Sequence, residues 1–246
     1  MDYKNMEEAY FSSSLGRLYY KYSESESPDT IILLHGFGAS SLSWSRLIEK
    51  IPESLSIIAM DILGHGNSDA PEIAYTIQNQ AKAVSELISS LNGKKITLMG
   101  HSYGGWIAAT IAINGRCNNL VLEDSAGMDK FDDERLAADP DFREKLIKEA
   151  LVTNPNEHVL RSIVYSRIED DYLNEERLSR INMPTLVIWG EQDMMIPVKF
   201  AYSISSRIKR SELFIIKGAK HTPHYTNPQE VADKVLSFLA QSKKIL

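Results

Sequence analysis

Cysteine is nearly absent from the 246-residue sequence, and long apolar runs are missing. The single cysteine, Cys117, excludes an internal disulfide bond, and no apolar run has the length that a membrane-spanning helix needs. Residues 1–8 are polar and acidic, unlike a secretory signal peptide. Lysine and arginine number 27 against 33 aspartate and glutamate residues, and the charge of −6 disfavours nucleic acid or anionic membrane as a partner. We therefore expect a cytoplasmic protein that binds neither.

Short apolar runs alternate along the chain with segments of helical periodicity. Six runs are apolar at successive positions, which is typical of strands buried on both faces of a parallel sheet. They cover residues 30–34, 56–60, 95–99, 120–122, 185–189 and 213–216. Helices are predicted over 43–51, 77–91, 104–114, 198–208 and 228–241. This alternation predicts an α/β fold with a doubly wound, mostly parallel sheet, to which residues 17–22 add an antiparallel hairpin at one edge.

Residues 127–181 interrupt this alternation with charged, helix-like sequence. Two apolar helical faces are predicted there, one formed by Phe142, Leu146, Ile147 and Leu151 and the other by Val159, Leu160, Ile163 and Val164. Two ordinary crossover helices are the alternative, but a crossover needs only about a dozen residues or somewhat more. We therefore expect residues 1–126 and 182–246 to form the core, and residues 127–181 to form a small helical cap, or lid, inserted before the last strands.

The run Gly100–Gly104 joins a predicted strand to a predicted helix. Residues 96–99 before it are apolar, and residues 105–109 after it are small or apolar. A serine at such a sharp turn presents its hydroxyl at the end of the sheet, and flanking glycines avoid a clash with neighbouring backbone. Ser102 is therefore a candidate nucleophile. We expect the adjacent His101 to point away from it and to be structural.

A serine hydroxyl needs a base to take its proton and an acid to orient that base. His221 follows the last predicted strand on a loop that can reach the same sheet edge, and His224 is its main rival. Asp193 lies in the turn after the penultimate strand and is the leading candidate acid. Glu191 and Asp124 also follow strands, so either could take its place.

The oxyanion of a tetrahedral intermediate needs two backbone donors. The amide of Tyr103, directly after the serine, is one candidate. The amide of Phe37, in the glycine-rich turn 35–38, is the other. Such a turn can also bind phosphate, but Ser40 and Ser41 stand where the fuller dinucleotide pattern has its third glycine. We therefore favour an oxyanion hole.

Together these segments resemble the α/β-hydrolase superfamily, especially its lid-bearing esterases and carbon–carbon bond hydrolases. The matching segments are 35–38 with Trp44, 61–68, 100–104, 190–193 and 221–223. The resemblance implies that Ser102 attacks an acyl carbon, that His221 is its base and that Asp193 steadies the imidazolium. It also implies that the amides of Phe37 and Tyr103 hold the oxyanion. No metal or organic cofactor is implied.

Neighbouring residues are candidates for binding or for support. Phe37, Tyr103 and Met194 lie beside catalytic positions, and we expect them to line an apolar pocket. Trp106 and Met194 are our candidate substrate contacts, although Trp106 is also a candidate core residue. Four polar residues are expected to shape or brace the loops around the site: His35, Asp61, His65 and Ser68.

The favoured function is that of a serine carboxylesterase acting on small to medium acyl esters, as a monomer or homodimer. Three alternatives stay open: a carbon–carbon bond (diketone) hydrolase, an amidase or peptidase with the same triad, and a non-catalytic ligand receptor. Residues 124–127 resemble the carbon–carbon hydrolases to a degree. Epoxide hydrolases and haloalkane dehalogenases use an aspartate nucleophile, and the presence of Ser102 disfavours both.

Overall fold

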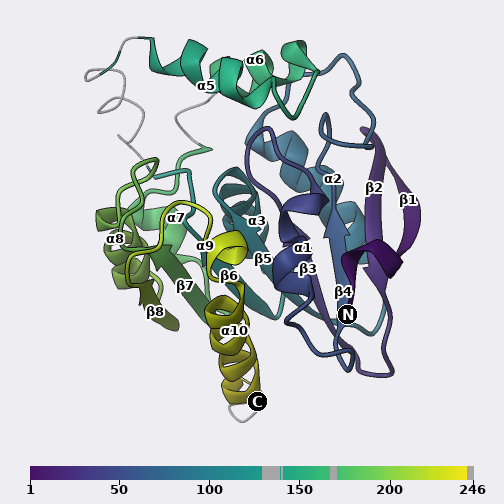
Figure 1. The fold of residues 1–246 in the computed structure, drawn as a ribbon, viewed down its shortest axis with the longest axis vertical. Coiled ribbons are helices and arrows are strands. Elements are labelled where there is room, and N and C mark those ends of the chain that lie inside the picture. The colour runs from purple at the N-terminus through teal and green to yellow at the C-terminus, as the bar shows by residue number, and fades with distance from the viewer. Residues whose placement is uncertain (129–138, 140, 167–170, 243–246) are drawn as a thin grey trace.

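A computed structural model describes residues 1–128, 139, 141–166 and 171–242 of the chain. Within them, eight strands form one sheet in the order β1-β2-β4-β3-β5-β6-β7-β8 (Figure 1). The strands are β1 (Glu7–Ser13), β2 (Gly16–Ser23), β3 (Asp29–Leu34), β4 (Ser56–Met60), β5 (Lys95–His101), β6 (Asn119–Glu123), β7 (Thr185–Gly190) and β8 (Ser211–Ile216). Pairs β1–β2 and β2–β4 are antiparallel, and every other pair is parallel.

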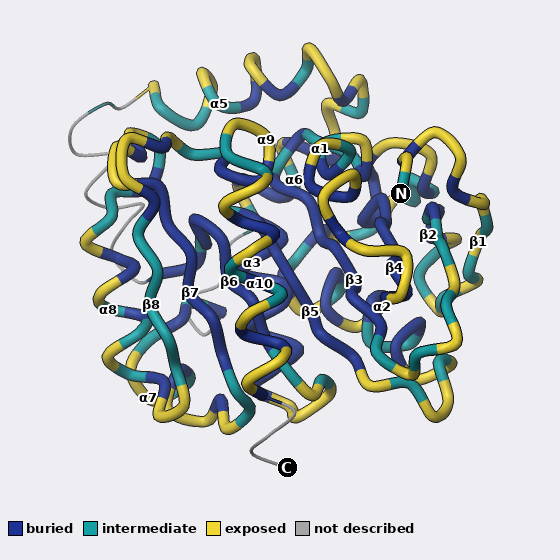
Figure 2. Tube along the Cα trace, turned by 60° about the horizontal axis from the view of Figure 1, so that its bottom comes forward, coloured by how far each residue is buried: buried dark blue, intermediate teal, exposed yellow. Residues whose placement is uncertain are grey.

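Helices cover both faces of this sheet. The helices of the described residues are α1 (Ser45–Ile48), α2 (Ile77–Ser90), α3 (Tyr103–Ile113), α5 (Phe142–Ala150), α6 (Glu157–Tyr165), α7 (Glu175–Ser179), α8 (Lys199–Arg207), α9 (Pro223–Thr226) and α10 (Pro228–Ser242), with 3₁₀ turns at Tyr3–Asn5 and Ser41–Trp44. Buried residues of α1 and α10 form one apolar cluster with the sheet, and those of α2, α3 and α8 form another. Successive residues of β3 enter opposite clusters, so the central strands are buried on both faces (Figure 2).

The predicted doubly wound sheet is confirmed, including the antiparallel edge hairpin. Two boundaries differ from the prediction in ways that matter for the site. Strand β5 continues to His101, so the strand pairs with β6 up to the residue before Ser102. The helix predicted over 43–51 is shorter because its first turn is the 3₁₀ segment ending at Trp44.

The described residues between β6 and β7 contain three helices and no strand. Helices α5 and α6 lie over one end of the sheet (Figure 1), and they pack on each other through Ile147, Ala150, Leu160 and Val164. The predicted apolar face of α6 is buried, whereas only Ile147 of the other predicted face is buried. Phe142, Leu146 and Leu151 stay partly exposed, the first two at a cavity. Parts of the predicted cap, residues 129–138, 140 and 167–170, lie outside the described residues, and its bounds stay a prediction.

Among the residues described, no helix combines the length and the apolar character needed to cross a membrane.

The turn after β5 leaves no room for a side chain on Gly104. A Cβ there would lie 2.2 Å from the carbonyl oxygen of Leu34 and 2.5 Å from that of His35. Alanine favours helices more than glycine does. We nevertheless expect Gly104→Ala to lower the free energy of unfolding by about 3 kcal/mol, because the backbone at Leu34 and His35 must move to make room for the methyl group. Urea denaturation measures this loss.

Gly115→Ala is the matched control, because a Cβ there has no atom within 4 Å and only the φ of 70° is unfavourable. Its expected cost is about 1 kcal/mol. Equal losses in the two variants would show that close packing at Gly104 is not the constraint.

Candidate active site

Ser102 stands at the sharp turn between β5 and α3. Its φ of 50° and ψ of −115° are rare for a residue other than glycine. The turn is held by backbone hydrogen bonds: the Ser102 N–H donates to the carbonyl of Glu123 at 2.9 Å, and the Ser102 carbonyl accepts from Ala126 at 3.0 Å and Trp106 at 3.2 Å. Packing therefore maintains a strained backbone that directs the hydroxyl away from the sheet.

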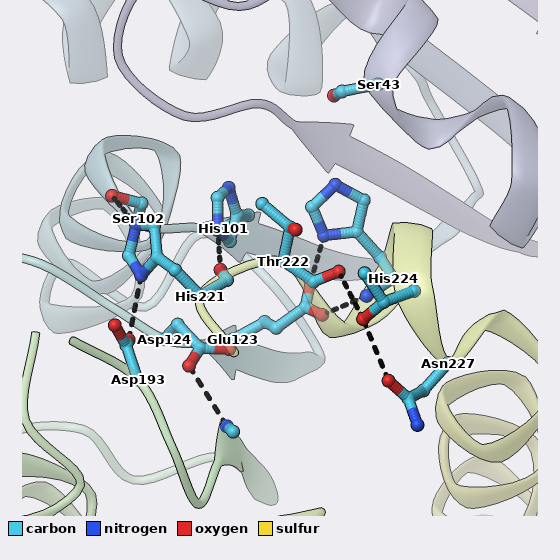
Figure 3. Close-up of polar contacts among 12 residues, drawn as sticks. Ser43, His101, Ser102, Glu123, Asp124, Asp193, His221, Thr222, His224 and Asn227 are labelled. Carbon is cyan, nitrogen blue, oxygen red and sulfur yellow. Dashed lines mark hydrogen bonds and ion pairs between the residues drawn. The ribbon is translucent and has the colours of Figure 1, made fainter. Parts of the chain in front are cut away.

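His221 links Ser102 to Asp193 (Figure 3). Its Nε2 lies 3.1 Å from Ser102 Oγ, and its Nδ1 lies 2.7 Å from Asp193 Oδ2. The Asp193 carboxylate can only accept, so Nδ1 carries the proton in the neutral ring and Nε2 faces the serine as an acceptor. The other Asp193 oxygen accepts from the N–H groups of Met195 at 2.7 Å and Ile196 at 2.9 Å. The structure thus brings the three predicted triad residues together.

The rival base and acid lie elsewhere. His224 is buried against Trp44, with ring centroids 4.3 Å apart, and its Nδ1 lies 2.9 Å from the Glu123 carboxylate. Glu191 is exposed and accepts from the Gly218 N–H. Asp124 is buried beside Asp193, and Asp193 rather than Asp124 meets His221 Nδ1.

Glu123 was not predicted from the sequence as a residue that supports the site. Its position, as a carboxylate at the end of an otherwise apolar strand, could have indicated such a role. Besides the His224 ring, it accepts the backbone N–H of His224 at 2.6 Å. The loop between β8 and α9 is therefore tied to the end of β6. His101 supports the same loop, because its Nε2 lies 2.6 Å from the carbonyl oxygen of His221. The His101 ring also lies beside the His221 ring, with centroids 4.9 Å apart.

Two buried histidines hold the turn that carries Phe37. His35 donates through Nδ1 to the Gly36 carbonyl at 2.8 Å and accepts the Ile62 N–H at Nε2. His65 accepts the Gly38 N–H at 3.2 Å. Burial lowers the pKa of His35 to about 4 and that of His65 to about 3. Both rings are therefore neutral, as their acceptor roles require.

Asp61 and Ser68 brace the adjoining loop. The Asp61 carboxylate accepts from the N–H groups of Ser41 at 2.7 Å and Asn67 at 2.8 Å. The Ser68 hydroxyl donates to the Asp61 carbonyl and accepts the Tyr19 N–H. These contacts join the loop after β4 to the turn after β3, so the position of Phe37 depends on both.

A small apolar cavity of about 70 Å³ opens at Ser102 and His221. Its other lining residues are Phe37, Tyr103, Ala126, Gly127, Met128, Phe142, Leu146, Ile163, Tyr172, Met195 and Ile196. The described part of this lining contains no lysine, arginine, aspartate or glutamate. At roughly 15 Å³ for each water-sized group, the cavity has room for about five such groups. A short apolar chain fits these dimensions.

The two candidate substrate contacts lie outside this lining. Trp106 is buried, donates from Nε1 to the Asp171 carbonyl at 2.8 Å and stacks on Tyr172, which does face the cavity. Met194 is 79% exposed. Because Asp193 binds the N–H groups of the second and third residues after it, the chain turns tightly and directs residue 194 outward. Its neighbour Met195 lines the cavity instead, which residue order alone does not indicate.

Among the described residues, Asp124, Asp193 and His221 form the one cluster with the composition of a metal site. A carboxylate oxygen or ring nitrogen of each lies within 4.8 Å of the others. Asp193 and His221 already share a direct hydrogen bond of 2.7 Å, so these two groups are paired with each other. We assign no metal to them.

The buried His35 and His65 predict a loss of stability in acid. Below their ordinary pKa of 6.5, the unfolded state binds protons that the folded state excludes until the pH nears about 4 and about 3. The free energy of unfolding should therefore fall by roughly 1.4 kcal/mol per pH unit for each ring over this window. Urea unfolding at a series of pH values measures the slope. In His65→Gln the slope should be shallower, and an unchanged slope would contradict the assignment.

Comparisons with known proteins agree with this architecture. The chain matches the family described as alpha/beta hydrolase fold over residues 29–160 and 152–228. It is 27% identical to 2-hydroxy-6-oxo-6-(2'-aminophenyl)hexa-2,4-dienoic acid hydrolase of Metapseudomonas resinovorans, over 92% of this chain and 89% of that protein. It is 24% identical to mouse (Mus musculus) monoacylglycerol lipase ABHD6, over 86% and 75%. A putative lipase from Acinetobacter baumannii superimposes with a TM-score of 0.82 at 20% identity, over 99% and 94%. The chain belongs to the α/β-hydrolase fold family.

Proposed function

We propose that the protein is a serine carboxylesterase that cleaves esters of small to medium acyl groups. The observation that carries this proposal is the continuous contact from Ser102 through His221 to Asp193 at the mouth of an apolar cavity. A hydroxyl paired with an oriented imidazole is a nucleophile with its base in place. The substrate is a small-molecule ester.

In the first half of the reaction, Ser102 Oγ attacks the ester carbonyl carbon while His221 Nε2 takes the hydroxyl proton. Asp193 stabilises the imidazolium that forms. The N–H groups of Phe37 and Tyr103 bind the oxyanion; loss of one such donor costs roughly 2.7–4 kcal/mol in other enzymes. The imidazolium then protonates the leaving alcohol, and an acyl-enzyme remains.

In the second half, His221 takes a proton from a water molecule that attacks the acyl carbon. The resulting tetrahedral intermediate uses the same two N–H donors. Its collapse returns the proton from His221 to Ser102 and releases the acid. Because the backbone of the turns at Phe37 and Ser102 is fixed before substrate binds, these donors need little rearrangement during the reaction.

The cavity favours an ester over the substrate of a carbon–carbon hydrolase. The relative from Metapseudomonas resinovorans acts, by its name, on a dienoic acid, whose carboxylate would need a compensating charge or hydrogen bonds. The described cavity lining offers apolar side chains, the His221 ring and the hydroxyl-bearing side chains of Ser102, Tyr103 and Tyr172, but no lysine or arginine to balance a carboxylate. An uncharged acyl chain requires no more than these, and the mouse relative is named for a lipid ester.

Replacing the nucleophile tests the proposal. We expect Ser102→Ala to lower kcat/KM for p-nitrophenyl butyrate by at least about 10⁴-fold, because the covalent step is lost. Ser89→Ala on the exposed surface of α2 is the control and should retain full activity. A fluorophosphonate probe should label the parent protein and Ser89→Ala, but not Ser102→Ala.

Three results would contradict this function. Hydrolysis by Ser102→Ala at the parent rate would exclude Ser102 as nucleophile. A folded parent protein that neither hydrolyses esters nor takes up the probe would instead be a ligand receptor. Faster turnover of a ring-cleavage dienoate than of simple esters would assign the enzyme to carbon–carbon bond hydrolysis.

The size of the cavity predicts an acyl-chain preference. With p-nitrophenyl esters of increasing acyl length, kcat/KM should pass through a maximum at short chains and then fall by about tenfold or more. Leu146→Ala removes part of the wall that α5 contributes and should move the maximum to longer chains. Val152→Ala, 85% exposed just beyond α5, should leave the profile unchanged. The same maximum in all three proteins would show that α5 does not limit the acyl group.

A further inference from the structure

Asp124 is a buried carboxyl group beside the proposed triad that the mechanism does not use. It follows β6 directly, and its φ of 44° lies in the left-handed region that residues other than glycine rarely adopt. Oδ1 accepts the Gly190 N–H at 3.0 Å. Oδ2 is buried and has no hydrogen-bond partner among the described residues. A buried carboxylate with one donor for two oxygens is poorly compensated for its loss of water.

The groups around Asp124 make its ionisation still less favourable. A carboxylate oxygen of Asp193 and a ring nitrogen of His221 lie within 4.8 Å of it and of each other. Glu123 precedes it in the chain, with its own carboxylate on His224. Burial, and then the charges of Glu123 and Asp193, raise the pKa of Asp124 well above the ordinary value for aspartate.

We propose that Asp124 carries a proton on Oδ2 and donates it in a hydrogen bond to the Asp193 carboxylate, as a positioning residue for the triad. This rests on the proposed function of Ser102, His221 and Asp193. The proton turns an unpartnered acceptor into a donor, and Asp193 is the acceptor beside it. Asp193 is then held from three directions: by the Met195 and Ile196 amides, by His221 and by Asp124.

A neutral Asp124 also leaves the charge at the base unchanged. An ionised Asp124 would repel Asp193 and would favour the positively charged form of His221. The proton therefore fixes the orientation of the acid without adding a second negative charge next to the imidazole. This arrangement separates the positioning role of Asp124 from an electrostatic one, and the two make different predictions.

Two variants separate these roles. Asp124→Asn keeps an acceptor for Gly190, keeps a donor for Asp193 and tolerates positive φ. Its kcat should stay within about fivefold of the parent value, as expected for exchanging one neutral donor for another. Asp124→Ala removes the donor and should lower kcat by about 10- to 100-fold with a smaller change in KM, because His221 is less well oriented. Circular dichroism and urea unfolding report whether each variant is folded.

The pH profile of kcat/KM distinguishes a neutral Asp124 from an ionised one. With Asp124 neutral, the acid-side midpoint of Asp124→Asn should match that of the parent protein. If Asp124 were ionised, its removal would take a negative charge away from within 4.8 Å of the imidazole and would shift this midpoint to lower pH by about one unit or more. Such a shift, or an Asn variant as impaired as the Ala variant, would overturn the proposal.

An infrared measurement tests the proton without using activity. In the Ser102→Ala background, the spectrum near neutral pH should contain the carbonyl stretching band of a protonated carboxylic acid, shifted in D₂O and absent after the further change Asp124→Asn. Absence of the band would refute the proton on Asp124 even if ester hydrolysis is correct. Presence of the band, together with a folded parent protein that hydrolyses no ester although Ser102 is intact, would refute the proposed function alone.

Discussion

The close approach of the α3 backbone to the ends of β3 and β5 is the constraint on which the rest of the site depends. A Cβ on Gly100 would lie 2.2 Å from the Gly104 carbonyl oxygen, and one on Gly104 equally close to that of Leu34. Only glycine at both positions lets the chain reverse within a few residues, and the reversal places Ser102 in its strained conformation. The proposed nucleophile, Ser102, is therefore positioned by backbone packing, and the loops that carry His221 and Asp193 are placed relative to that turn.

The end of β6 organises those partners. Glu123 and Asp124 are adjacent, so their side chains leave the strand in different directions. Glu123 contacts His224 and fixes the start of α9, directly after the loop that holds His221. Asp124 binds the Gly190 N–H at the end of β7, directly before the loop that holds Asp193. One strand end thus anchors both loops, and the Ser102 N–H binds the carbonyl of the same Glu123. The positions of all three groups of the proposed triad therefore depend on contacts with the end of β6.

Much of this arrangement could be predicted from sequence because its signals are local. Ser102, His221 and Asp193 each follow an apolar run, and parallel strands bring their carboxyl ends to one edge. The supports were harder to predict. Glu123 ends an apolar strand, but its partner His224 lies 101 positions further along the chain, so the local sequence does not indicate what it binds. The residues that line the cavity were equally hard to predict from local sequence. Adjacency to the acid suggested Met194, but the hydrogen bonds of Asp193 within its own turn direct Met194 outward and Met195 inward.

Charge balance explains how three carboxyl groups share this buried region. Glu123 accepts from the His224 backbone and ring, and Asp193 accepts from two backbone N–H groups and His221, so each has donors on both oxygens. Among the described residues, Asp124 has one donor, on Oδ1. When neighbouring carboxylates compete, the proton binds where ionisation is least compensated. That place is Asp124. The described lining of the apolar cavity at His221 supplies no further charge. The hydrogen bonds of the three carboxyl groups therefore decide which of them orients the proposed base.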